Sequence, residues 1–137
     1  MKYKEDVFMY DRYYEKCNIN PYGKSVGDCT IRAISLALDQ SWDKTYFDLC
    51  LQGYKMGDMP SANNVWGAYL RSKGFKRSAI PDFLPENYSV RDFCAETPKG
   101  IFVLACSGHV VAVIDGKYHD AWDSGDKVPI YYWERRK

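Results

Sequence analysis

Apolar residues recur at helical spacing in the first half of the chain. From Asp28 onwards, Ile31, Ile34 and Leu38 follow one another at i, i+3 and i+7, and the other sides of this segment hold few polar residues. A helix that is apolar on most sides is buried. Because Asp28 is a favourable N-cap residue, the pattern predicts a buried helix with Cys29 in its first turn.

Three further helices are predicted after the first. Ser41 and Ser89 suit helix N-termini, and Asp92 stands at the capping-box position after Ser89. Gly74 suits the C-terminal end of the middle helix. The three helices are expected to run from Ser41 toward Gly53 or Gly57, over residues 62–73, and over residues 90–96.

The pattern changes after Pro98 to short apolar runs rich in β-branched residues, which predict strands. Asp115-Gly116 is a strong hairpin signal between two of them. Residues 1–28 are rich in tyrosine and turn-forming residues, and they are expected to form an irregular lead-in. Because helices precede strands, the fold class is α+β with a C-terminal antiparallel sheet. The expected strands cover residues 101–106, 109–114, 117–123 and 128–133.

Length and composition narrow the class of protein. The chain has 137 residues, a formal net charge of +1 at pH 7 and 46% hydrophobic residues, which predicts one globular domain over residues 1–137. The balanced charge favours neither nucleic acid nor a membrane surface as a partner. No stretch approaches the roughly 20 apolar residues that cross a bilayer, and residues 1–16 lack the apolar run of a signal peptide. A cytoplasmic location is expected.

The five cysteines are odd in number and never form a C-x-x-C pair, so the pattern favours free thiols over a disulfide framework or a zinc site. A thiol at a helix N-terminus is favoured as the thiolate by the unpaired N–H groups and the helix dipole. The N–H of Cys29 itself could also donate to an oxyanion. Cys29 is therefore the candidate nucleophile, and Cys17, Cys50, Cys94 and Cys106 are interpreted as structural.

His109 is the candidate base, because it opens an apolar strand directly after Ser107-Gly108. A histidine base needs a third group that fixes its orientation, and the next strand offers Asp120 and Asp123. A two-residue turn would place Asp120 diagonally across from His109 on the same face. A bulge at Gly116 would instead place Asp123 opposite His109. The local sequence permits both turns, and Asp123 is the favoured acid.

The order of these residues resembles that of the papain-like cysteine peptidase superfamily. Two blocks, GDCTIRAISLALDQSWDKTYFDL (27–49) and GHVVAVIDGKYHDAWDS (108–124), are similar to the signature blocks of small bacterial and phage papain-like proteins. The resemblance implies a papain-like fold in which the cysteine attacks a carbonyl, the histidine acts as base and then acid, and an Asn or Asp orients the histidine. By position these roles fall on Cys29, His109 and Asp123, with Asp120 as the alternate acid.

The resemblance also raises the question of a second oxyanion donor. The superfamily usually carries a Gln or Asn five or six residues before the cysteine, where this chain has Lys24 and Gly23. The nearest amides are Asn18 and Asn20.

Several other polar and aromatic residues have simpler interpretations. Arg32, Lys44 and Arg71 are expected to be helix-surface charges, and His119 to be exposed or structural. Trp122 is either a core anchor or a shield for the bond between His109 and its acid.

The sequence therefore predicts a cysteine hydrolase that cleaves a peptide or isopeptide bond in an amide-containing substrate. No metal or organic cofactor is expected, because side chains supply the nucleophile, base and acid. An acyl or amide transferase would use the same residues and deliver the acyl group to an amine. An inert papain-like scaffold would keep the fold without the reaction.

Overall fold

Four helices and a six-stranded mixed sheet form residues 12–135, the part of the chain that the computed structural model describes. This confirms the α+β class. In chain order the elements are β1 (Tyr14–Lys16), α2 (Cys29–Leu38), α3 (Trp42–Met56), α4 (Asn63–Ser72), β2 (Phe75–Ala79), α5 (Val90–Glu96), β3 (Ile101–Cys106), β4 (His109–Ile114), β5 (Lys117–Asp120) and β6 (Pro129–Arg135).

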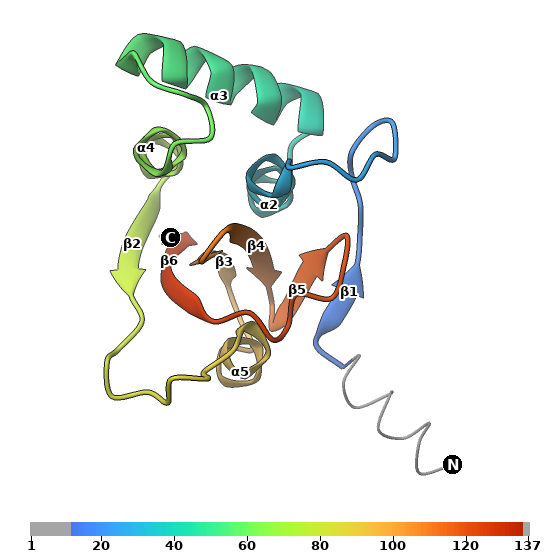
Figure 1. Cartoon of the computed structure of the whole chain (residues 1–137), viewed down its shortest axis with the longest axis vertical. Helices are drawn as coiled ribbons and strands as arrows, with labels where there is room; N and C mark the ends of the chain where they lie inside the picture. The colour runs from blue at the N-terminus through green and yellow to red at the C-terminus, as the bar shows by residue number, and fades with distance from the viewer. Residues whose placement is uncertain (1–11, 136–137) are drawn as a thin grey trace.

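The strands lie in the order β1-β5-β4-β3-β6-β2 (Figure 1). The β1–β5 pair is parallel and the other four pairs are antiparallel. The C-terminal strands β3–β6 pair antiparallel, as expected, but the whole sheet is mixed because part of the lead-in segment forms β1 and runs parallel to β5. Of that segment, residues 1–11 lie outside the described residues.

Helices cover both faces of the sheet (Figure 1). α2 and α4 lie on one face, α5 lies on the other, and α3 lies outside α2 and α4. Val103 and Ala105 pack with α2 and α4, whereas Phe102 and Leu104 pack with α5. Since successive strand residues point to opposite faces, a sheet buried on both faces explains why β3 and β4 are apolar at nearly every position.

The helices begin where their sequence signals predict. The Ser41 hydroxyl accepts a hydrogen bond from the Lys44 N–H, and Ser89 and Asp92 form the complete capping box. α3 ends at Gly57, in the left-handed conformation, and not at Gly53. No helix within residues 12–135 is both long and apolar enough to cross a lipid bilayer.

Two edge strands were not predicted. β1 has three residues, and β2 exposes Lys76 and Arg77. Charged residues are common on edge strands because they discourage pairing with another chain. Short, polar strands show little alternation of hydrophobic and polar residues. β1 and β2 are therefore defined by their pairing with β5 and β6, respectively, and not by local sequence pattern.

The hairpin turn between β4 and β5 provides a test of the fold. Gly116 has φ +78°, and an added Cβ would lie 3.2 Å from the Pro98 Cα. Gly116→Ala should therefore lower the free energy of unfolding by about 1–3 kcal/mol. Gly27→Ala is the matched control, since nothing lies within 4 Å of its added Cβ. Denaturant unfolding measures both variants, and an equal effect would contradict the assigned turn.

Candidate active site

The β4–β5 turn decides which aspartate meets His109. Asp115 and Gly116 have φ values of 48° and 78°, as a two-residue type I′ turn requires. Ile114 pairs with Lys117 without a bulge. This register brings Asp120 to His109, with 2.6 Å between its Oδ2 and the histidine Nε2.

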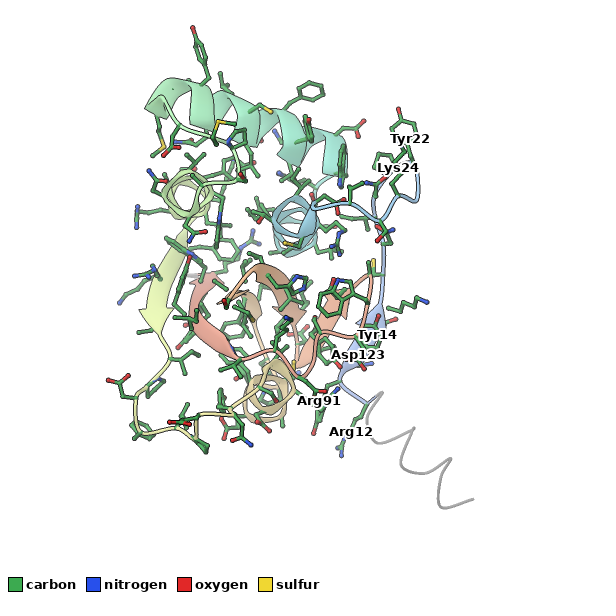
Figure 2. The ribbon with its side chains drawn as sticks, in the orientation of Figure 1. Arg12, Tyr14, Tyr22, Lys24, Arg91 and Asp123 are labelled. Carbon is green, nitrogen blue, oxygen red and sulfur yellow. The ribbon has the colours of Figure 1, made fainter. Side chains whose placement is uncertain are left out.

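Asp123, the favoured acid, does not orient His109. Its Oδ1 accepts hydrogen bonds from the Tyr118 hydroxyl at 2.5 Å, the Gly125 N–H at 3.1 Å and Arg91 at 3.3 Å. Figure 2 shows Asp123 near Arg91, toward α5 and away from α2. The expectation was wrong because it required the bulge at Gly116, which the structure does not have.

Cys29 is the first residue of α2, and its thiol lies close enough to the His109 side chain for their interaction to lower the pKa of the thiol. Because Asp120 engages Nε2, Nδ1 is the ring nitrogen available to the sulfur. The Val110 N–H and the Thr30 side chain also hydrogen bond to Cys29. Burial raises the pKa of Cys29, but these hydrogen bonds and the charge of His109 outweigh burial and lower the pKa below its ordinary value.

The His109 ring is buried, with 6% of the residue exposed. Burial lowers the pKa of His109, but hydrogen bonds with Asp120 and Cys29, together with their charges, raise it to about 9. The Trp122 ring lies 4.6 Å from the imidazole, and Trp122 is itself 44% exposed. Trp122 is therefore a cover between His109 and solvent and not a core anchor.

The Asp120 carboxylate is held by several hydrogen bonds from other parts of the chain. Oδ2 accepts from Ser124 at 2.5 Å as well as contacting His109, and Oδ1 accepts from Arg32 and the Ala121 N–H, both at 2.8 Å. Burial raises the pKa of Asp120, but the hydrogen bonds from His109, Ser124 and Arg32 outweigh burial and lower the pKa below its ordinary value. Asp120 is thus held as a carboxylate in a fixed orientation.

The sequence interpretation also placed Arg32 wrongly. It is not a surface charge, since only 6% of it is exposed and it lies between two carboxylates. Its Nε donates to Asp28 and its Nη1 donates to Asp120, each at 2.8 Å. The i,i+4 spacing of Asp28 and Arg32 in an otherwise apolar helix was the available sequence signal.

Asp28 forms an ion pair with Arg32 and does not cap α2 with its side chain. Its side chain makes no cap hydrogen bond, although it stands at the N-cap of α2. Asp28 Oδ2 instead accepts from Asn20 at 3.1 Å and Trp42 at 3.0 Å. The first-turn N–H groups of α2 therefore have no capping side chain.

The amides before Cys29 hold the loop together. Asn20 Oδ1 accepts from the N–H groups of Tyr22 and Lys24, and its Nδ2 donates to Asp28. Asn18 Nδ2 donates to the Lys24 carbonyl. Both candidate oxyanion donors are thus engaged in loop hydrogen bonds.

The other cysteines lie in different environments. Burial raises the pKa of Cys94 and of Cys106 to about 12, and burial also raises the pKa of Cys17. His119 is half-buried, and burial lowers its pKa. Within residues 12–135, no three His, Cys, Asp or Glu side chains are grouped so that they could hold a metal ion.

A cavity of about 200 Å³ opens beside the first turn of α2. Gly27, Asp28 and Thr30, which surround Cys29 in the chain, line one side of it, and Leu49 of α3 and Pro60 line the other. The charge of Asp28 is matched by Arg32. The cavity is largely apolar, and its lining includes both chain neighbours of Cys29 but not Cys29 itself.

Comparison of the chain with protein-family models, curated proteins and solved structures found no match.

The buried ion pairs predict a large effect of one substitution. Arg32→Met leaves two buried carboxylates without their cation, and it should lower the free energy of unfolding at pH 7 by about 3–5 kcal/mol. Lys44→Met, which breaks the exposed pair with Asp48, should cost about 1 kcal/mol or less.

The effect of Arg32→Met should depend on pH. The depressed pKa values of Asp28 and Asp120 stabilise the fold above their unfolded values near 3.8, and this stability is lost as the pH falls through the folded values. The difference between wild type and Arg32→Met should therefore shrink toward acid pH in denaturant unfolding. A difference independent of pH would contradict the electrostatic role.

Proposed function

We propose that this protein is a cysteine hydrolase that cleaves an amide bond through Cys29, His109 and Asp120. The observation that carries the proposal is the contact of the Cys29 thiol with an imidazole that is itself bound to a buried carboxylate at 2.6 Å. A nucleophile, a base and a group orienting the base within hydrogen-bond reach are the signature of an activated nucleophile.

The electrostatics favour a charged pair near neutral pH. The pKa of Cys29 is lowered and that of His109 is raised to about 9, each mainly by hydrogen bonds that outweigh burial. The lowered pKa of Cys29 beside the raised pKa of His109 favours transfer of the thiol proton to the imidazole. Thiolate, and not thiol, is the nucleophilic form of cysteine.

The surroundings of the sulfur suit an acyl substrate. The Cys29 N–H lies at the start of α2 without a capping side chain, so it can donate to the oxygen of an attacked carbonyl. The cavity beside Thr30 can hold an apolar part of the substrate. Trp122 limits the access of water to the bond between His109 and Asp120.

The proposed reaction has two steps. The Cys29 thiolate attacks the carbonyl carbon, the C–N bond breaks, and His109 gives its proton to the leaving amine. His109 then takes a proton from water, whose oxygen attacks the thioester carbon. The C–S bond breaks, the carboxylic acid leaves, and the Cys29 sulfur returns to the thiolate. Asp120 keeps Nδ1 directed at the sulfur in both steps. By this proposal the chain is a small papain-like protein with Asp120 in the place expected for Asp123.

Alkylation at pH 6 tests the thiolate. Iodoacetamide should modify Cys29 on the order of ten times faster than Cys17, whose pKa is raised by burial. His109→Ala should slow the alkylation of Cys29 by a similar factor, because the thiolate loses its counter-ion. Peptide mass spectrometry over time measures each cysteine separately.

The two aspartates form a matched pair of controls for this experiment. Asp120→Asn should slow alkylation of Cys29, whereas Asp123→Asn should leave it near the wild-type rate. If Cys29 reacts no faster than Cys17, the chain is an inert scaffold and the proposal is wrong.

Acylation distinguishes hydrolysis from transfer. p-Nitrophenyl acetate should acetylate Cys29, and water should then release acetate even when glycine ethyl ester is added as an acceptor amine. Intact-mass measurement follows the acyl-enzyme, and chromatography identifies the product. Cys29→Ala is the control. N-acetylglycine ethyl ester as the main product would contradict hydrolysis and support the transferase.

A further inference from the structure

A second cavity lies toward the edge of the sheet that β6 and β2 form, opposite the edge formed by β1 and β5. It has a volume of about 350 Å³ and lies between α4 and the β2–β6 pair. Two arginines line it, Arg71 from α4 and Arg77 from β2, together with Asn63 and Asn64. No aspartate or glutamate is among its lining residues. We refer to it as the arginine groove.

Aromatic rings hold both arginines in place. The Arg77 guanidinium lies 4.1 Å from the centre of the Tyr131 ring, and that of Arg71 lies 5.3 Å from the Trp133 ring. Stacking occupies the flat face of a guanidinium and leaves its N–H edge available. Within residues 12–135, neither arginine forms an ion pair with a carboxylate.

Two like charges in one groove repel each other unless an anion lies between them. Lys73 and Lys76 lie near the groove residues in the chain, and Glu134, which stands opposite Lys76 in the β2–β6 pair, offsets part of their charge. Folding thus places two ordered cations together without a partner of opposite sign. An oxyanion with two or more acceptor oxygens matches this arrangement, because guanidinium groups bind phosphate through paired N–H donors.

The start of α4 adds donors to the same groove. Asn63 Oδ1 accepts from the Trp66 indole at 3.2 Å, which leaves its amide N–H groups to donate. The N-terminus of α4 has no side-chain cap hydrogen bond. The Trp133 indole N–H is buried and, among the described residues, has no hydrogen-bond partner. The acceptors among the lining side chains are neutral amide and hydroxyl oxygens, and the lining has no carboxylate to bind a cationic ligand.

We propose that the arginine groove binds a phosphate-bearing ligand, with Arg71 and Arg77 as the paired donors to its oxygens. From Asn64 to Arg71 the groove follows α4 for roughly 10 Å, at about 1.5 Å per residue. This length suits a diphosphate or two successive phosphates of a nucleic-acid backbone. The proposal does not depend on the activity of Cys29. His109 and Asp120, which act with Cys29, lie on β4 and β5, toward the other edge of the sheet.

Titration with sodium pyrophosphate, at constant ionic strength, tests this site in the full-length chain. The indole N–H resonance of Trp133 should shift and saturate, because its ring lies under Arg71. Arg71→Gln and Arg77→Gln should each weaken the affinity on the order of tenfold. Arg77→Lys should weaken it less, since the charge remains and only the paired geometry is lost.

Lys55→Gln is the matched control, because it removes one exposed positive charge from α3, outside the groove. It should bind pyrophosphate as wild type does. A shift that does not saturate, or an equal loss in Lys55→Gln, would overturn the proposal.

A second arm uses a single-stranded oligothymidylate in place of pyrophosphate. Arginine-dependent binding that is tighter than that of pyrophosphate would identify a nucleic-acid backbone as the source of the phosphate. Binding of pyrophosphate alone would identify a small phosphorylated molecule. Cys29→Ala should bind pyrophosphate and the oligothymidylate as wild type does. Failure of the phosphate-binding proposal can therefore be distinguished from failure of the alkylation experiment.

Discussion

The ion pair between Arg32 and Asp120 joins the helix that carries Cys29 to the strand that orients His109. α2 and β5 are distant in the chain, and the two groups are 88 residues apart. Both side chains are almost completely buried, so their attraction is weakly screened and their geometry is narrowly defined. Without this contact, Asp120 would be a buried carboxylate with a less constrained orientation.

The same contact explains a feature that appears unfavourable in the sequence. Asp28 stands directly before Cys29, and a carboxylate there opposes ionisation of a thiol. Asp28 is nevertheless tied to Arg32, whose charge offsets its own. The buried groups alternate in sign from Asp28 to Arg32, Asp120 and His109. The negative charge of Asp120 beside His109 favours the protonated imidazole, and the protonated imidazole in turn favours the thiolate of Cys29.

Functional groups of the chain divide between the two ends of the sheet. Toward the β4–β5 end lie Cys29, His109 and Asp120, the proposed nucleophile, base and acid, each of which interacts with a partner. The β6–β2 end holds Arg71 and Arg77, which rest on aromatic rings and have no carboxylate partner in the described part of the chain. A matched network is suited to internal proton transfer, whereas an unmatched pair of cations is suited to an external anion. The proposal for one end of the sheet therefore does not depend on the proposal for the other end.

The sequence by itself determined the local features of the structure. Helical spacing, caps at Ser41 and Ser89, and the turn at Asp115-Gly116 identified the helices and the central hairpin, because these signals depend on neighbours within a few residues. The same signals placed Cys29 at a helix start and His109 at a strand start.

Tertiary structure decided what depends on distant partners. Whether Asp120 or Asp123 met His109 depended on a single-residue difference in register, and local sequence permitted both. The burial of Arg32 required β5 to lie against α2, and β1 and β2 became strands only by pairing with β5 and β6. Such contacts join residues far apart in the chain, so short-range pattern carries little information about them.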